Sequence, residues 1–277
     1  MKSIIIAASL TVLATAHEHP KDYEADVTGW QVVTRPSADK FDELWGFLNR
    51  ANMSGIEWSV RLDMGTVKAV LGKGYVAALA VERPKFSLNQ SKDADPRGEP
   101  NAIHKVSDGW LVSYNRGEFG GAVWWFSADG SERRAISKHR VSQFITHQKR
   151  VLAVEGLAHM GSSEGSVIEF TRKDHWTVST FIELPQSGEV VVPLPDGRLC
   201  IVASDMLLAL SMDGRLEVLI PNARWGSLYP NSAVYDQTSQ TLYIGMRQFV
   251  ARYKVTPANH SFVLTVPSKA FLSPYDR

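Results

Sequence analysis

The sequence predicts an all-β fold, a β-propeller of five or six four-stranded blades with one short N-terminal helix. Three observations lead to this prediction: an internal repeat of blade length, short β-rich runs separated by tight turns, and a single amphipathic helical segment. The chain has 277 residues, 44% of them hydrophobic, enough for one well-cored domain. A β-sandwich with irregular loops is the alternative, and a repeat that persists through four copies favours the propeller.

The repeat consists of a β-rich run that follows a tight turn, a loop, and a second β-rich run. The first runs begin at Trp110, Val151, Leu199 and Leu242. The second runs begin at Gly121, Gly165, Asp205 and Gln248. The second runs start roughly 40–44 residues apart, which is the length of a four-stranded propeller blade. We expect Trp124, Val167, Leu207 and Val250 to occupy equivalent or adjacent positions that face the cores between blades.

The N-terminal part is less regular. Strands near 66–71 and 75–81 suggest a fifth blade, and 29–33 with 57–62 would complete a sixth by pairing an N-terminal strand into the last blade. Between them, apolar residues at helical spacing predict one short amphipathic helix that packs on the propeller as a lid or plug. These residues are Phe41, Leu44, Trp45 and Leu48, with Ser37 as the expected N-cap.

The first 16 residues have the features of a signal peptide. Lys2 supplies a positive start, 4–13 is an apolar run too short to span a bilayer, and Ala14-Thr15-Ala16 is an A-x-A cleavage site. The β-branched apolar run is also compatible with a buried strand. We therefore predict cleavage before His17, a single propeller domain over 17–277, and a periplasmic or secreted protein.

Charge and cysteine content narrow the function classes. Lys and Arg total 30 and Asp and Glu total 29, without blocks of like charge, so we expect no nucleic-acid partner and no anionic-membrane partner. No apolar run after the first 16 residues is long enough for a transmembrane helix. The single cysteine, Cys200, lies in an apolar run and is expected to be a buried, unreactive thiol.

The repeat register gathers one set of loops at one end of the predicted blades, around the channel mouth. Aromatic walls with a few convergent polar groups are typical of ligand pockets. The expected ligand-binding residues are Glu118, Glu155, His159, Trp225, Tyr229, Asn231 and Arg247. Because a guanidinium binds carboxylates through two hydrogen bonds, we expect Arg247 to anchor a small anionic ligand or a protein partner. Alternatively, Glu155 pairs with Arg247, and the two aromatic residues only pack the mouth.

One segment, Leu228-Tyr229-Pro230-Asn231-Ser232-Ala233 followed by Thr241-Leu242-Tyr243-Ile244, resembles a signature of the SMP-30/gluconolactonase-like propellers. The resemblance implies a divalent metal bound by Asn231 together with an acidic ligand and further ligands from other blades. Glu155 and Asp205 are the candidates for the acidic ligand, although neither lies in a motif of that family. Ser232 stands where that family has Gly, and Arg247 would repel a cation. The repeat as a whole resembles exported bacterial propellers of the PQQ-like or NHL-like kind.

Three functions compete. The sequence has no G-x-S-x-G, no H-E-x-x-H and no phosphate-binding Gly-rich loop. We therefore predict a non-catalytic propeller without a cofactor that binds a ligand or a protein, with a periplasmic inhibitor or immunity-type role as one form of it. The alternative is a metal-dependent lactonase or esterase of the SMP-30-like kind with one divalent cation. A purely structural or assembly propeller is the third option.

Overall fold

The computed structural model describes residues 23–72, 82–88, 96–256 and 261–273. The predicted signal peptide and the predicted strand at 75–81 lie outside the described residues. Within these ranges, no helix has the length and apolar character needed to cross a membrane.

Three consecutive sheets are antiparallel and four-stranded, with strands hydrogen-bonded in chain order. The first sheet contains β5 (Ala102–Val106), β6 (Gly109–Asn115), β7 (Gly121–Ser127) and β8 (Arg133–Ser137). The second contains β9 (Val141–His147), β10 (Arg150–His159), β11 (Ser162–Arg172) and β12 (Trp176–Leu184). The third contains β13 (Gly188–Pro193), β14 (Leu199–Ala203), β15 (Leu207–Leu210) and β16 (Leu216–Ile220). These are the blades that the repeat predicted.

Two further sheets depart from four strands. The last blade contains β17 (Ser232–Asp236), β18 (Thr241–Gly245), β19 (Val250–Lys254) and β20 (Phe262–Val266), and β2 (Gln31–Val33) adds to β20 as a fifth strand. This confirms that an N-terminal strand pairs into the last blade. The strand predicted at 57–62 does not join that blade. As β3 (Trp58–Asp63) it pairs with β4 (Thr66–Leu71) across a tight turn, and β1 (Glu24–Asp26) completes this sheet.

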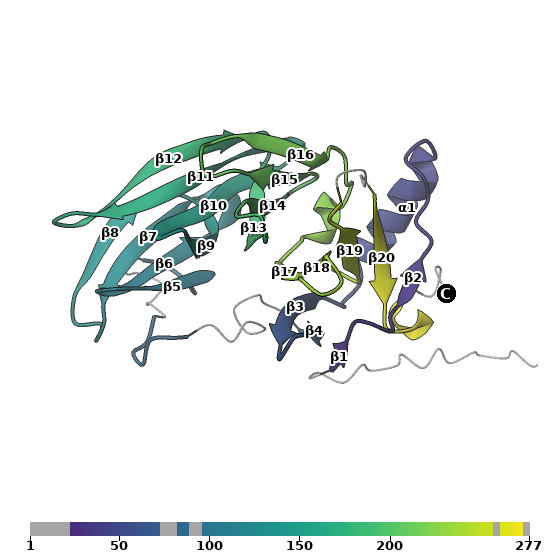
Figure 1. Ribbon diagram of the computed structural model, residues 1–277, viewed down its shortest axis with the longest axis horizontal. Coiled ribbons are helices and arrows are strands. Elements are labelled where there is room, and N and C mark those ends of the chain that lie inside the picture. The colour runs from purple at the N-terminus through teal and green to yellow at the C-terminus, as the bar shows by residue number, and fades with distance from the viewer. Residues whose placement is uncertain (1–22, 73–81, 89–95, 257–260, 274–277) are drawn as a thin grey trace, which may run out of the picture.

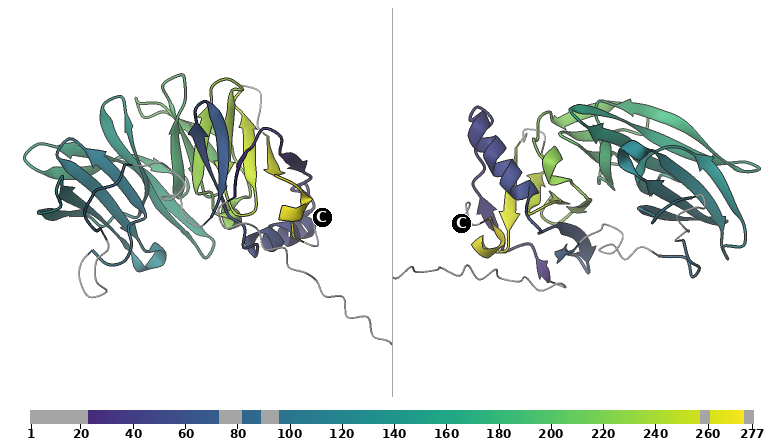
Figure 2. Two further views of the ribbon diagram at one scale, coloured as in Figure 1. Left: turned by 90° about the horizontal axis from the view of Figure 1, so that it is seen from below. Right: turned by 180° about the vertical axis from the view of Figure 1, so that it is seen from behind.

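The five sheets follow one another through their first strands. β5 contacts β9, β9 contacts β13, β13 contacts β17, and β17 contacts β3. In Figures 1 and 2 the N-terminal strands, in purple, lie beside the C-terminal strands, in yellow. The propeller prediction is therefore confirmed, with five sheets in the described residues rather than a complete set of four-stranded blades.

The cores between sheets come from the middle strands, which are apolar on both faces. All five residues of β14 are buried, as are all four of β15. Of the residues expected at equivalent core positions, Val167, Leu207 and Val250 are buried, whereas Trp124 is partly buried against the cluster around Trp110. Strands buried on both faces have continuous rather than alternating hydrophobic residues, which is why these runs were recognisable.

The single described α-helix, α1 (Phe41–Asn52), follows β2 and packs on the last blade. It buries Leu44 and Leu48 as predicted, but it buries Phe47 and Ala51 instead of Phe41 and Trp45. The expected N-cap was also wrong. The cap residue is Lys40, which makes no side-chain capping bond, and the Ser37 carbonyl accepts a hydrogen bond from the Lys40 amide.

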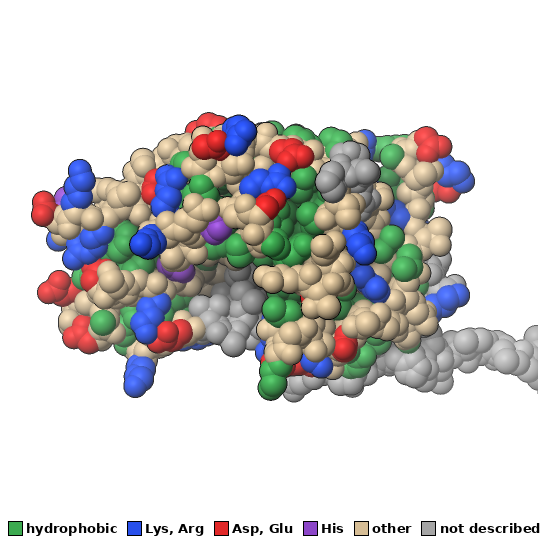
Figure 3. Space-filling view, viewed as in Figure 1, with side chains coloured by type: hydrophobic (Ala, Val, Ile, Leu, Met, Phe, Trp, Pro, Cys, Tyr) green, Lys and Arg blue, Asp and Glu red, His purple; other side chains and the backbone are tan. Residues whose placement is uncertain are grey.

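Three short 3₁₀ turns complete the described structure: η1 (Gly117–Phe119), η2 (Gly226–Leu228) and η3 (Lys269–Phe271). Positive and negative side chains are interspersed on the face shown in Figure 3. This distribution agrees with the formal net charge of +1.

Candidate functional site

A cavity of about 600 Å³ opens at one end of the sheets, among the loops that join second to third strands and the links between sheets. We call this end of the sheets the cavity end. The described lining comes from loops and strand ends of the first three sheets and from the link that contains η2. Its residues are Asn115, Gly117, Ser142, 156–163, Gln186, Ser187, Glu189, Ser204, Asp205, Gly226, Ser227, Tyr229 and Pro230.

Beside the cavity, two glycines let the link between the second and third sheets lie close to a strand pair. Gly156 pairs with Gly165 across β10 and β11, next to the link at Gln186 and Ser187. A Cβ atom on Gly165 would lie 2.6 Å from the Glu155 carbonyl oxygen and 2.8 Å from that of Gln186. Glycine is therefore required for this close approach of the link to the strand pair.

Two first strands carry a β-bulge at the cavity. In β9 the pairing passes from Gln143 to Val141, so Ser142 has no partner residue on β10. In β13 it passes from Gly188 to Val190, so Glu189 has no partner residue on β14. Ser142 and Glu189 both line the cavity. A bulge changes the direction of a side chain and is common beside functional sites. A bulge in each of two neighbouring blades therefore places one polar side chain, Ser142 or Glu189, in the cavity lining.

Glu189 is the residue of the described lining whose pKa is clearly shifted. Burial raises the pKa of its carboxyl, and a hydrogen bond with Ser187 offsets part of that effect. The described lining contains no Lys or Arg to neutralise it. A partly buried carboxyl that has no Lys or Arg beside it in the described lining is suited to accept hydrogen bonds from a ligand or to pair with a ligand cation. Glu189 is not among the residues predicted to bind a ligand, and the sequence signal for a bulge here is Gly188, the residue before it.

A hydrogen-bonded network forms one wall of the cavity. The Ser163 and Ser204 hydroxyls are 2.9 Å apart, and the Ser187 amide donates to Ser163 Oγ at 2.8 Å. Gln186 Oε1 accepts from the Ser204 hydroxyl and from the Asp205 amide. These contacts fix the link between the second and third sheets against the turn between β14 and β15. The polar groups that face the cavity are thus held in place before any ligand arrives.

Three of the residues predicted to bind a ligand or metal line this cavity: His159, Tyr229 and Asp205. His159 Nε2 lies 2.8 Å from Glu118 Oε2, and both side chains are half-exposed. Asp205 Oδ1 accepts a 2.9 Å hydrogen bond from the Gly226 amide at the start of η2. The structure therefore brings Glu118, His159, Tyr229 and Asp205 to this end of the molecule, with Glu118 outside the lining itself.

Trp225 does not face the cavity, contrary to the expectation that it forms an aromatic wall. Its side chain is fully buried, its Nε1 donates to the Ala203 carbonyl at 3.0 Å, and its ring packs against Phe262. Trp225 is a core residue because its large apolar ring and single donor are both satisfied inside the molecule.

Glu155, Asn231 and Arg247 also lie outside the lining. Glu155 accepts a 2.7 Å hydrogen bond from the Ser166 hydroxyl. Arg247 donates to the Asn52 carbonyl at 2.9 Å and to the Asn52 side chain, so the alternative ion pair with Glu155 is not formed. The Arg247 guanidinium stacks on the Tyr229 ring at 4.4 Å. Arg247 thus contacts the Tyr229 ring and Asn52, and it is not among the residues that line the cavity.

The suggested metal ligands do not act together. The Asn231 side chain donates to Glu57 and accepts from Ser59 and Ser232. Glu155 and Asp205 are bonded to other groups. Among the described residues, no cluster of three or more His, Cys, Asp or Glu is placed to hold a metal ion. Cys200 is buried as expected, and burial raises its pKa to about 12, so it is not a nucleophile.

Comparisons with known proteins give distant likenesses. No protein-family model and no curated protein sequence matches the chain. A virginiamycin B lyase from Staphylococcus aureus, solved with quinupristin, is similar at 12% identity and a TM-score of 0.42, over 62% of this chain and 57% of that one. A gluconolactonase from Xanthomonas campestris is similar at 14% identity and a TM-score of 0.40, over 61% and 57%. The chain therefore spans little more than half the length of either enzyme.

The extracellular domain of a candidate one component system from B. thetaiotaomicron is similar at 11% identity and a TM-score of 0.45, over 85% of this chain and 29% of that one. The similar structures thus include a lyase, a lactonase and an extracellular domain. They agree on a distant likeness to β-propeller proteins and specify no function.

Proposed function

We propose that this chain is a non-catalytic binding protein whose cavity takes a small hydroxylated ligand bearing an ammonium group. The observation that carries the proposal is the partly buried Glu189 carboxyl on a bulge of β13, inside a cavity lined by serine hydroxyls and backbone groups. The cavity volume of about 600 Å³ lies in the range of small-molecule sites.

The charge of the lining favours a cation over the anion expected from Arg247. Glu189 and Asp205 are acidic, whereas Arg247 is bonded to Asn52 and lies outside the lining. An anionic ligand would meet the Glu189 carboxyl without a Lys or Arg in the described lining, whereas Asp205 interacts with the charge of Arg35 outside it. An ammonium group would instead form a charge-assisted hydrogen bond with Glu189.

The test compares three sugars that share a frame and differ in charge: glucosamine, glucose and glucuronate. Isothermal titration calorimetry at neutral pH should give affinities in the order glucosamine, then glucose, then glucuronate. Replacing Glu189 by Gln should remove the preference for glucosamine, and the exposed Glu183→Gln should keep it. Equal affinities, or tightest binding of glucuronate, would overturn the proposal.

The metal-dependent lactonase remains a separate hypothesis that no observation on the cavity favours. Of its three suggested ligands only Asp205 lines the cavity, and Asn231 and Glu155 are engaged elsewhere. Hydrolysis of gluconolactone that is lost on chelation and in Asn231→Ala would support that function. We expect chelation to leave glucosamine binding unchanged. A protein partner, including an inhibitor or immunity-type role, likewise lacks a specific supporting contact.

The proposal includes export to the periplasm or the medium, based on the N-terminal sequence. Mass spectrometry of protein recovered outside the cytoplasm should give a chain that begins at His17. Functional protein that retains Met1 would contradict this part of the proposal and leave the binding test unaffected.

A further inference from the structure

Beside the cavity that contains Glu189, called the polar cavity from here on, lies a second hollow on the side of α1. Its volume is about 240 Å³, and its apolar lining is Phe41, Leu44, Trp45 and Leu48 of the helix. Asp205, Gly226 and Ser227 line this hollow and also line the polar cavity. The two spaces therefore share one wall, formed by Asp205 and the start of η2. We call the second space the helix groove.

Two aromatic side chains of α1 are exposed in the helix groove, although other side chains already attach the helix to the last blade. Phe41 is 57% exposed and Trp45 is 54% exposed. Their rings lie parallel, 6.4 Å apart with an interplanar angle of 6°, one turn apart on the helix. Leu44 and Leu48 are buried beneath them and already anchor α1. The exposed pair is thus not needed to attach the helix, and it is placed for stacking on a planar group.

One polar side chain that lines the helix groove, Arg224, has a nitrogen atom without a hydrogen-bond partner among the described residues. Arg224 has a left-handed backbone conformation with φ of 55°, and its buried Nε atom has no hydrogen-bond partner among the described residues. Arg224 lines the groove beside the aromatic pair. Guanidinium groups stack favourably on aromatic rings, so a planar arm in the groove would meet Phe41 and Trp45 as well as Arg224.

We infer that the helix groove binds an aromatic arm of the same ligand whose hydroxylated, amine-bearing head occupies the polar cavity. The inference rests on the proposed function and adds the ligand class: an aromatic glycoside of an amino sugar, or a molecule of the same chemistry. Its support is the wall shared by the two spaces, with Glu189 in the lining of the polar cavity and the rings of Phe41 and Trp45 in the lining of the helix groove.

The experiment compares the phenyl and methyl β-glycosides of glucosamine by calorimetry on the full chain. The two probes share the head and differ only in the arm. Burial of a phenyl ring should tighten binding about tenfold or more. In Phe41→Ala/Trp45→Ala that gain should disappear while the methyl glycoside binds as before. Because both side chains are half-exposed, the variant should fold, which thermal unfolding will check. Trp45→Phe should retain most of the gain.

The outcomes separate the two claims. If neither glycoside binds, the proposed function fails and the inference fails with it. If both bind equally, the polar cavity is a site and the helix groove is not part of it. If the phenyl gain survives in the double variant, the arm lies elsewhere and the inference is wrong.

Discussion

The two ends of the same sheets are built differently. At the cavity end, the first strands of two blades are interrupted by bulges at Ser142 and Glu189, and small residues leave space between the loops. At the opposite end, which we call the turn end, the strands are joined by the tight turns at 147–150, 194–198 and 211–215. Strand β14 connects the two ends, since it runs from Leu199 beside the turn at Asp196 to Ala203 beside the cavity.

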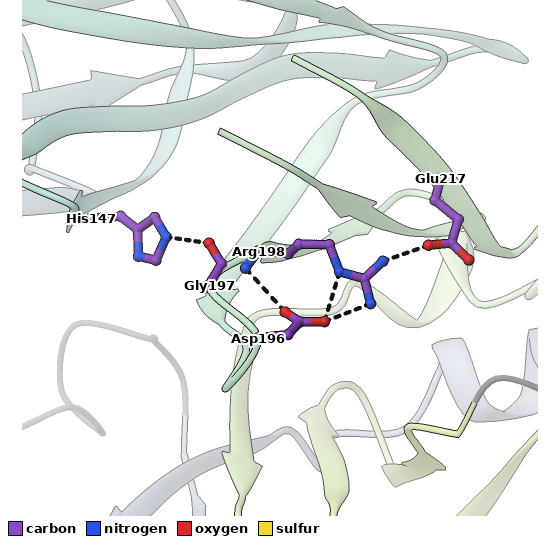
Figure 4. Close-up of polar contacts among 5 residues, drawn as sticks. All are labelled: His147, Asp196, Gly197, Arg198 and Glu217. Atoms are coloured by element: carbon purple, nitrogen blue, oxygen red, sulfur yellow. Dashed lines mark hydrogen bonds and ion pairs between the residues drawn. The ribbon is translucent and has the colours of Figure 1, made fainter. Parts of the chain in front are cut away.

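Polar side chains at the turn end are paired with one another (Figure 4). Arg198 bonds Asp196 through its backbone amide and its Nε, and its Nη1 reaches Glu217 on β16 at 2.5 Å. His147 Nε2 lies 2.8 Å from the Gly197 carbonyl oxygen, which joins the second sheet to the third. At the cavity end, by contrast, Glu189 is left without a cationic partner in the lining.

The difference appears in the direction of two pKa shifts. At the cavity end, burial raises the pKa of Glu189. At the turn end, burial also acts to raise the pKa of Asp196, but the hydrogen bonds and charge of Arg198 outweigh it and lower that pKa. The turn end thus stabilises its charges within the fold, whereas the cavity end leaves the Glu189 carboxyl without a Lys or Arg in the described lining. The following predictions test this division.

The largest effect is expected for Gly165→Ala at the cavity end. The added Cβ would clash with the carbonyl oxygens of Glu155 and Gln186, both of which are backbone atoms that cannot move away separately. We expect a loss on the order of 3 kcal/mol in the free energy of unfolding and a displaced link beside the cavity. Urea unfolding measures it. Gly55→Ala, where the added Cβ meets nothing within 4 Å, is the control and should change little.

The next effect concerns Glu189→Gln and its dependence on pH. Because the folded-state pKa is raised, the folded protein binds more protons than the unfolded one between the two pKa values, so stability falls as pH rises through that window. The variant should therefore be more stable than the parent at pH 7, and this gain should shrink at pH 4. Urea unfolding at both values checks it. A variant that is less stable at pH 7 would show that Glu189 has a stabilising partner in the folded state.

At the turn end, two Asp-Gly-Arg turns provide a matched comparison. In Asp196-Gly197-Arg198 the arginine also reaches Glu217, whereas in Asp213-Gly214-Arg215 the pair is largely exposed. Arg198→Ala should lose about 0.5–1 kcal/mol at pH 7, and Arg215→Ala should lose close to nothing. The loss in Arg198→Ala should decrease in acid, since the depressed pKa of Asp196 contributes stability only above its ordinary titration range. Equal losses would mean that Glu217 adds nothing.

The smallest effect is expected for His147→Ala. It removes the bond to the Gly197 carbonyl, but Gln148 Nε2 also donates to that oxygen at 3.2 Å. The carbonyl therefore keeps a partner, and the loss should be about 0.5 kcal/mol. The double variant with Gln148→Ala should lose more than the sum of the single losses, as thermal unfolding can show.

The sequence by itself determined the blades. Runs such as Leu199–Ala203 are buried on both faces and bounded by turn residues. Their backbone groups can form hydrogen bonds only in a sheet with neighbouring strands on both sides. The spacing at which such runs recur gives the length of a blade. The turn chemistry at Asp196 and Asp213 was local and was therefore readable as hairpins. The amphipathic helix was readable for the same reason, since Leu44 and Leu48 are spaced to lie on one face.

Only the tertiary structure decided the site. Whether Trp225 faces a cavity or the core depends on Ala203 and Phe262, which are distant in sequence. Arg247 bonds Asn52, 195 residues earlier in the chain, and lies outside the cavity lining. Glu189 faces the cavity because a one-residue bulge changed its direction, and strand alternation alone cannot reveal such a shift. Local patterns fix which segments pair, but the direction of each polar side chain follows from contacts between blades.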